Sequence, residues 1–231
     1  MKSLKDLVES LIGSRQQKTK EIPQITAITE DELRELINAG GASVADGGES
    51  DSPKEPSAHL LGLFSAVEEE KIAELAHAFL VLQEYTRNKK SADQKPIDFY
   101  ISTYGGSADD MFALYDVMRI VKKDLTIRTV GLGKVMSAGV LLLAAGTNGE
   151  RKIAKNCRVM IHSVIGGNQG AIHNMLNEME AIEQLQQMFI DCLVEETKMT
   201  KIQLREMLDR KVNVYLSAEE AVELGIADII I

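Results

Sequence analysis

The sequence has few cysteines and a shortage of basic residues, and each deficit excludes a class of protein. Only two of the 231 residues are cysteine, Cys157 and Cys192, and they do not form a Cys-x-x-Cys pair. Neither a disulfide framework nor a cysteine-based metal site is therefore expected. The 26 Lys and Arg residues are outnumbered by 35 Asp and Glu residues, which gives a net charge of −9. A negative net charge argues against nucleic acid as a partner, and it also argues against binding to a membrane surface through a basic segment.

Long apolar runs are also missing. The longest fully apolar stretch lies near residues 140–145 and is far shorter than the roughly 20 residues that a bilayer-spanning helix needs. The amino-terminal segment carries Asp6 and Glu9 inside its only apolar stretch, so it does not resemble a secretory signal. With 45% hydrophobic residues, the composition is that of an ordinary globular protein. We therefore expect a cytoplasmic protein without membrane contact.

The composition divides the chain near residue 57. Residues 40–57 are mainly Gly, Ser, Pro and acidic residues, which is typical of a flexible linker. Two short amphipathic stretches precede it, at residues 3–12 and 29–38, and neither is long enough to fold alone. Residues 1–57 are therefore predicted to be an amino-terminal extension, either partly disordered or used as a docking helix or propeptide. The folded domain is predicted at residues 58–231.

From residue 60 onward, segments with helical spacing alternate with segments typical of strands. Helices are expected at residues 67–88, 107–123, 137–145 and 170–198 and from Ser217 onward, and strands at 97–103, 125–130, 158–162 and 227–231. The apolar side of the first helix is expected to comprise Ile72, Leu75, Ala76, Phe79, Leu80 and Leu82. Such alternation predicts an α/β fold whose strands pair in parallel through right-handed crossovers.

Three motifs place polar groups where strands end, which is where α/β folds keep their sites. Gly105 and Gly106 separate a strand from a helix, so they form either a plain turn or a loop whose N–H groups meet an anion. Ser137 opens a buried helix, either as an ordinary N-cap or beside N–H groups that stabilise an oxyanion. His162 closes a strand, in a structural or a catalytic role.

Taken in order, these motifs resemble the proteolytic subunit of the caseinolytic (Clp) protease family. His162 follows Ser137 by 25 residues, and three further segments are similar to the family's histidine strand, the loop after it and its carboxy-terminal signature. These segments are RVMIH at 158–162, GGNQG at 166–170 and LSAEEAVELGIAD at 216–228. The resemblance covers about residues 59–231. It implies a crotonase-like fold of parallel strands with crossover helices and one long projecting helix, the handle, at residues 171–198.

The resemblance implies a serine peptidase site. Ser137 would be the nucleophile and His162 its general base, because a serine hydroxyl is a poor nucleophile until a neighbouring imidazole takes its proton. The backbone N–H groups of Gly106 and Ala138 would form the oxyanion hole. Extended peptide would bind by backbone hydrogen bonds to a loop and to a strand expected after it. The loop residues are Gly166, Gly167, Asn168, Gln169 and Gly170.

The third triad residue departs from the family pattern. The family normally has an aspartate at the position of Asn213, and two extra residues precede this position, which leaves Asp209 as a less favoured substitute. Asparagine can orient His162 but cannot stabilise the imidazolium by charge. In a Ser-His-Asp triad the change from Asp to Asn lowers turnover about 10⁴-fold, although papain-like enzymes use asparagine productively.

Two further departures lie beside the predicted site. Tyr104 stands where the family usually has proline. The segment 131–134 makes the approach to Ser137 two residues longer than in the family and brings Lys134 close in sequence. Lys134 is expected to be a solvated lysine, and a Ser–Lys dyad is the alternative.

The resemblance also implies an assembly and a partner. Family members form a tetradecamer of two stacked seven-membered rings around a chamber, into which an ATP-driven AAA+ Clp unfoldase feeds unfolded polypeptide. The apolar residues of the handle would need a partner surface. They are Met175, Leu176, Met179, Ile182, Leu185 and Met188. No metal or cofactor is expected, and without a Gly-x-x-x-x-Gly-Lys-Ser/Thr run this chain is not expected to bind ATP.

Three other functions remain open. A crotonase-type acyl-coenzyme A enzyme would stabilise an enolate and would need no serine–histidine pair at this spacing. A capsid-maturation or signal-peptide-peptidase-like serine peptidase could share the fold. A weakly active or catalytically silent Clp-type ring subunit would explain Asn213.

Overall fold

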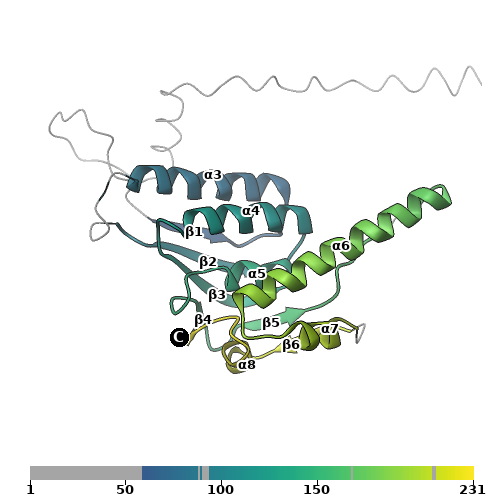
Figure 1. Ribbon diagram of the computed structural model, residues 1–231. Coiled ribbons are helices and arrows are strands. Elements are labelled where there is room, and N and C mark those ends of the chain that lie inside the picture. Colours follow the sequence, from purple (N-terminus) through teal and green to yellow (C-terminus); the bar gives the residue numbers. More distant parts are fainter. Residues whose placement is uncertain (1–58, 88, 90–93, 168, 210–211) are drawn as a thin grey trace, which may run out of the picture. The chain divides into compact units, whose positions relative to one another are not determined.

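The computed structural model describes residues 59–231 except 88, 90–93, 168 and 210–211 (Figure 1). The predictions for residues 1–57, including the linker, lie outside the described residues. In chain order the elements are β1 Leu60–Leu63, α3 Glu69–Thr86, β2 Ile97–Thr103, α4 Ala108–Val121, β3 Ile127–Met136, α5 Ala138–Ala144, β4 Lys152–Ile153, β5 Arg158–Ile161, α6 Ile172–Glu196, α7 Lys201–Asp209, β6 Val214–Leu216, α8 Ala218–Glu223 and β7 Ile229–Ile230.

The strands of the described chain form one sheet in the order β1-β2-β3-β4-β7, with β5 paired to the end of β3 and β6 to β5. Every pair is parallel except β5 with β6, which is antiparallel. The predicted α/β class is confirmed, but the expectation of parallel pairing throughout is wrong at β6. That strand has three residues, too few to show a sequence period, and β1 and β4 were missed because they are also short.

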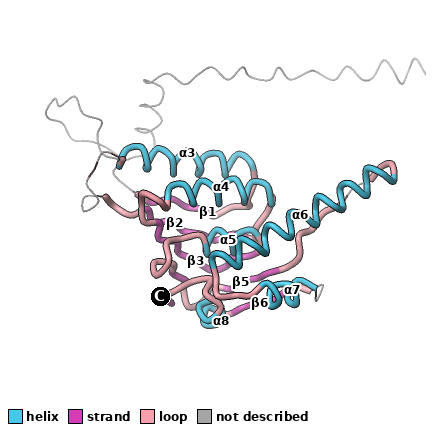
Figure 2. Tube along the Cα trace, viewed as in Figure 1, coloured by secondary structure: helices cyan, strands magenta, loops and turns pink. Residues whose placement is uncertain are grey.

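One face of the sheet packs against helices. Ile97, Phe99 and Ile101 of β2 are fully buried, whereas the residues between them are partly exposed. Helices α3, α4 and α5 lie over this face (Figure 2), and α5 is buried along its whole length. Leu80 of α3 was expected on the apolar side but is 42% exposed. It lies one residue, about 100° of helix rotation, beyond Phe79, which faces the sheet.

Strand β3 is longer than the predicted 125–130 and contains a bulge. The pairing with β2 shifts between Ile101 and Thr103, so that residues 132–134 of β3 oppose Ser102 alone. Gly133 within the bulge has φ 61°, which glycine adopts without a Cβ clash. The bulge falls within residues 131–134, the segment expected from the resemblance to be longer than the family pattern, and it precedes Ser137.

The long helix α6 projects from the domain at its amino-terminal end (Figure 1). Its buried residues, Phe189, Ile190 and Leu193, all belong to the last turns. Four of the six apolar residues predicted to be exposed are so: Met175, Leu176, Met179 and Met188. Ile182 and Leu185 are half-buried instead. None of the helices in the described ranges meets the length and hydropathy needed to cross a membrane.

Arg151 ties the carboxy-terminal segment to the rest of the domain. Its side chain is buried, and it donates hydrogen bonds to both carboxylate oxygens of Asp228, at 2.8 and 2.6 Å. It also donates to the carbonyl oxygens of Ala144 and Glu196. Partial burial pushes the pKa of the Asp228 carboxyl upward, but hydrogen bonds from Arg151 and the Gly149 N–H outweigh it and lower that pKa below its usual value.

Candidate active site

Ser137 lies at the turn from β3 into α5 with φ 54° and ψ −122°. It is the only non-glycine residue with positive φ in the described part of the chain. Such a conformation costs about 1–3 kcal/mol and is the geometry of a nucleophile elbow, which holds a hydroxyl exposed between a strand and a helix. Ser137 occupies the N-cap position of α5, but its side chain makes no cap hydrogen bond, so the hydroxyl does not serve as an ordinary cap.

Backbone hydrogen bonds hold this turn in place. The Ser137 N–H donates to the carbonyl of Met160 at 2.8 Å, and the Val140 N–H donates to the carbonyl of Ser137 at 3.0 Å. The turn is therefore fixed both to the neighbouring strand β5 and to the first turn of α5, which maintains the strained conformation.

The Gly105–Gly106 loop lies directly against Ser137. A Cβ at Gly105 would stand 2.6 Å from Ser137 Cβ and 3.1 Å from its Oγ, and Gly105 also has φ 98°. A Cβ at Gly106 would overlap the carbonyl of Val67, whose N–H donates to the carbonyl of Gly105 at 2.9 Å. Both glycines are thus required for the loop to lie between Val67 and the serine. This is more than a plain turn needs.

Thr103 anchors the loop and was missed in the sequence. Its buried hydroxyl donates to the carbonyl of Ser65 at 2.7 Å and accepts from the Gly105 N–H at 3.0 Å. A Cβ at Gly139 would stand only 2.6 Å from the methyl group of Thr103, so the glycine leaves room for this side chain. The sequence did contain a signal for this role. Thr103 is the last inward-facing residue of β2, the other inward-facing residues are apolar, and a glycine pair follows shortly after.

Two backbone N–H groups are the candidates for the predicted oxyanion hole: that of Ala138, which follows Ser137, and that of Gly106, which follows the glycine packed against Ser137. The Ala138 N–H belongs to the first residue of α5 and so has no acceptor within the helix. Among the described residues, no backbone carbonyl accepts from the Gly106 N–H. Donors left unpaired next to a hydroxyl are the arrangement that stabilises a tetrahedral oxyanion.

His162 and Ser137 follow the carboxyl ends of neighbouring strands. Met136 of β3 is opposite Met160 of β5, so Ser137 and His162 leave the same edge of the sheet within about one residue of each other. Both side chains are half-buried. In the described structure they do not hydrogen-bond to each other, which is common before substrate binds and tightens the site.

The register of β6 distinguishes the two candidates for the third residue. In the antiparallel pair, Ile161 is opposite Val214, and the next step along both chains sets His162 opposite Asn213. Directly opposed residues have Cβ atoms about 4.5–5.5 Å apart. Asp209 instead ends α7 and lines a cavity of about 560 Å³ with residues of α6 and α7. The geometry favours Asn213.

The segment after His162 is held by the helices that follow it. Ser163 Oγ donates to the carbonyl of Leu208 at 3.0 Å, and the Val164 N–H donates to Gln186 Oε1 at 3.2 Å. Gly166 lies so close to Ile182 of α6 that a Cβ would overlap it. The position of His162 therefore depends on α6 and α7.

The structure describes four of the five residues of the predicted peptide-binding loop. Gly166, Gly167, Gln169 and Gly170 are exposed, and Asn168 lies outside the described residues. The expectation of a strand after this loop is wrong for the described residues, because Ala171 is in no strand and α6 begins at Ile172.

The two cysteines do not compete with Ser137 as nucleophiles. Burial raises the pKa of the Cys157 thiol to about 11, and burial also raises that of Cys192, so neither forms a reactive thiolate near neutral pH. No cluster of three or more His, Cys, Asp or Glu side chains suited to a metal ion occurs among the residues whose positions are described.

Sequence comparison decides the family. A family model described as Clp protease matches residues 59–231, which contain every element described above. The chain belongs to the Clp protease family. The resemblance drawn from the serine, histidine and carboxy-terminal motifs is therefore confirmed, and so is the fold class.

Curated relatives agree with this family. The chain is 38% identical over 135 residues to ATP-dependent Clp protease proteolytic subunit 2 of Corynebacterium jeikeium and to proteolytic subunit 1 of Corynebacterium glutamicum, covering 58% of this chain and 63% of each relative. It is also 38% identical over 136 residues to proteolytic subunit 3 of Nocardia farcinica, covering 60% of that protein. The matched region spans less than two thirds of each of these relatives.

Proposed function

We propose that the protein is a serine endopeptidase and acts as the proteolytic subunit of an ATP-dependent Clp protease. The observation that carries the proposal is the strained, uncapped Ser137 at the turn from β3 into α5, packed against the Gly105–Gly106 loop, with His162 at the end of the adjoining strand. The rival crotonase-type activity needs the backbone donors but gives no reason for a strained serine beside a histidine.

The residues act in sequence on a peptide carbonyl. His162 takes the proton of Ser137 as Oγ attacks the carbonyl carbon, and the Gly106 and Ala138 N–H groups stabilise the resulting oxyanion. His162 then gives the proton to the leaving amine, and the C–N bond breaks to leave an acyl-serine. A water molecule then gives a proton to His162 as its oxygen attacks the ester. The proton passes to Oγ as the ester C–O bond breaks, which releases the carboxylic acid product and free Ser137.

Asn213 has a positioning role in this scheme. Its side-chain oxygen accepts a hydrogen bond from the imidazole and holds the ring with its other nitrogen toward Ser137. Because an amide carries no charge, the imidazolium is less stabilised than it would be beside aspartate. We therefore propose slow intrinsic turnover.

The proposed substrates are unfolded polypeptides, which bind in extended form to the exposed loop at 166–170. The exposed apolar residues of α6 support assembly into two stacked rings, because a projecting helix with Met175, Leu176 and Met179 in solvent needs a partner surface. An AAA+ Clp unfoldase would use ATP to feed the chamber, in the cytoplasm. This chain itself would need no cofactor.

A peptidase assay tests the proposal. Wild-type protein should hydrolyse short fluorogenic peptides and an unfolded protein, and Ser137→Ala should lose both activities while keeping its particle size. Equal hydrolysis by the two proteins would contradict the assignment of Ser137.

A catalytically silent ring subunit is the second candidate, favoured by Asn213 and by the missing hydrogen bond between Ser137 and His162. It predicts a stable ring-sized particle with no peptide hydrolysis at any pH. The same assay separates the two functions.

A further inference from the structure

Two cationic residues occupy opposed backbone positions on the strands that lead to Ser137 and His162. Lys134 of β3 is directly opposite Arg158 of β5, and like charges in that position repel. We call Lys134 and Arg158 the cation pair. Among the described residues, neither forms an ion pair with a carboxylate, although the chain has 35 acidic residues. An anion from outside the described chain would relieve this repulsion.

A tyrosine ring flanks each cation. Lys134 Nζ lies 4.6 Å from the ring centroid of Tyr104, and Arg158 Cζ lies 4.7 Å from that of Tyr215. The two rings are 72% and 48% exposed, so they do not belong to the core. A cation placed over an aromatic face is attracted by the ring quadrupole. The rings therefore hold the cationic groups at the surface.

Lys134 and Arg158 lie close in sequence to Ser137 and His162, respectively. Lys134 precedes Ser137 by three residues on the same strand, about 10 Å along the chain. Its aromatic partner, Tyr104, directly precedes Gly105, which touches the serine. Lys134 is part of the bulge at 132–134. Its Nζ contacts the ring of Tyr104 and makes no hydrogen bond to Ser137.

We propose that the cation pair binds the carboxylate of an acidic side chain in the peptide, a few residues from the bond to be cleaved, and gives the protein a preference for acidic segments. This inference rests on the proposed peptidase function. An ammonium offers three donors and a guanidinium offers a planar fork that suits a carboxylate. One carboxylate between Lys134 and Arg158 would neutralise the repulsion that each imposes on the other.

Peptide binding by Ser137→Ala tests the subsite without requiring turnover. The probe is a fluorescein-labelled, end-capped peptide of ten neutral residues in which one glutamate is moved through successive positions, with glutamine in the same place as its match. Fluorescence anisotropy should show, at one or two positions, about tenfold tighter binding of the glutamate peptide in low salt. The difference should shrink at high salt, because exposed charges are screened.

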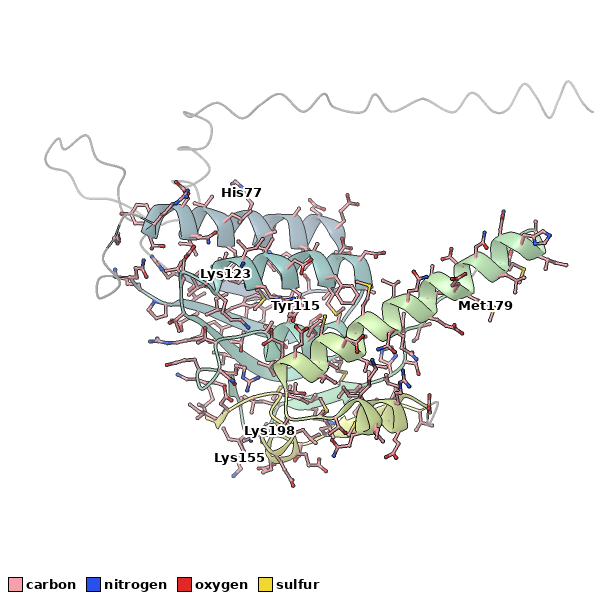
Figure 3. The ribbon with its side chains drawn as sticks, in the orientation of Figure 1. His77, Tyr115, Lys123, Lys155, Met179 and Lys198 are labelled. Carbon is pink, nitrogen blue, oxygen red and sulfur yellow. The ribbon has the colours of Figure 1, made fainter. Side chains whose placement is uncertain are left out.

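Variants on the Ser137→Ala background locate the effect. Lys134→Met should abolish the glutamate preference while leaving the affinity for the glutamine peptide unchanged. Lys134→Glu should abolish it as well, because the new carboxylate would pair with the opposed Arg158. Tyr104→Ala should weaken the preference and Tyr104→Phe should retain it, since phenylalanine keeps the ring face. Lys123→Met, at an exposed lysine that follows α4 (Figure 3), is the matched control and should change nothing.

The proposal is overturned if no position favours glutamate over glutamine, including the case in which no peptide binds. It is also overturned if Lys134→Met changes the particle size, because the pair would then be an interface between copies of this chain. Failure of the proposed peptidase function would be recognised from the hydrolysis assay and not from the binding assay. Wild-type protein would then hydrolyse no peptide, while the anisotropy result would still report on the cation pair.

Discussion

His162 and Asn213 are the next pair in the antiparallel register that joins Ile161 of β5 to Val214 of β6. Strand β5, which leads to His162, also pairs in parallel with β3, the strand that leads to Ser137. The order serine, histidine, asparagine across three neighbouring strands is a property of the backbone. A substitution at Asn213 should therefore change the chemistry of the site without changing the backbone positions of these three residues.

Replacing Asn213 by aspartate should raise turnover. The carboxylate would stabilise the imidazolium that forms during attack, and we expect a gain of about tenfold to 10³-fold in kcat with little change in KM. Asn213→Ala should lower kcat further. Asp209→Ala is the control and should leave kcat unchanged, since Asp209 lies in the cavity lined by α6 and α7. Loss of activity in Asp209→Ala with normal activity in Asn213→Ala would show that the assignment is reversed.

Gly105→Ala should abolish peptide hydrolysis. The new Cβ would stand 2.6 Å from Ser137 Cβ, so the serine or the loop must shift, and we expect kcat/KM to fall at least 100-fold. Gly149→Ala separates contact from backbone strain, because Gly149 has φ 86° but no atom within 4 Å of the new Cβ. It should cost about 1–2 kcal/mol of stability and retain activity. Full activity in Gly105→Ala would contradict the described contact.

The Asp228 carboxylate should make stability depend on pH in the acid range. Because its folded-state pKa is lowered, its contribution is present above the unfolded-state value of about 4 and is lost as pH falls through the folded-state pKa. Asp228→Asn should destabilise the fold by about 3 kcal/mol at neutral pH, since it leaves Arg151 buried without its partner. The variant should also show a weaker loss of stability below pH 4.

Urea unfolding between pH 3 and pH 7 measures both effects. Asp191→Asn is the control, because the Asp191–Lys201 pair is exposed on both sides and exposed pairs contribute little. Identical unfolding midpoints for wild type and Asp228→Asn at neutral pH would show that the Arg151–Asp228 pair does not support the fold.

The exposed end of α6 should be needed for assembly. Met179 is 59% exposed on the projecting part of the helix (Figure 3), and Met179→Gln removes apolar surface without adding charge. We expect the large particle seen by light scattering to shift toward smaller species. Glu178→Gln, at the neighbouring exposed position, should leave the particle unchanged. A wild-type protein that is strictly monomeric at micromolar concentration would remove the basis of this prediction.

The sequence predicted the helices better than it predicted the sheet. The buried helix after Ser137 was evident because its residues are wholly apolar, and the predicted helix starts at Ser107 and Ser217 coincide with the N-caps of α4 and α8. Strand β6 was missed because three residues carry no period, although its register is what brings Asn213 to His162. The cation pair was also missed, because only strand pairing reveals that Lys134 and Arg158 are opposed.

Labelling with a fluorophosphonate probe tests the central claim most directly, namely that Ser137 is a nucleophile activated by His162. Intact mass spectrometry of the wild-type protein should show one adduct per chain, and peptide mapping should locate it on Ser137. His162→Ala should label at least 100-fold more slowly, because the hydroxyl would keep its proton. Absence of the adduct from wild-type protein, its presence on another residue, or an equal labelling rate in His162→Ala would contradict the claim.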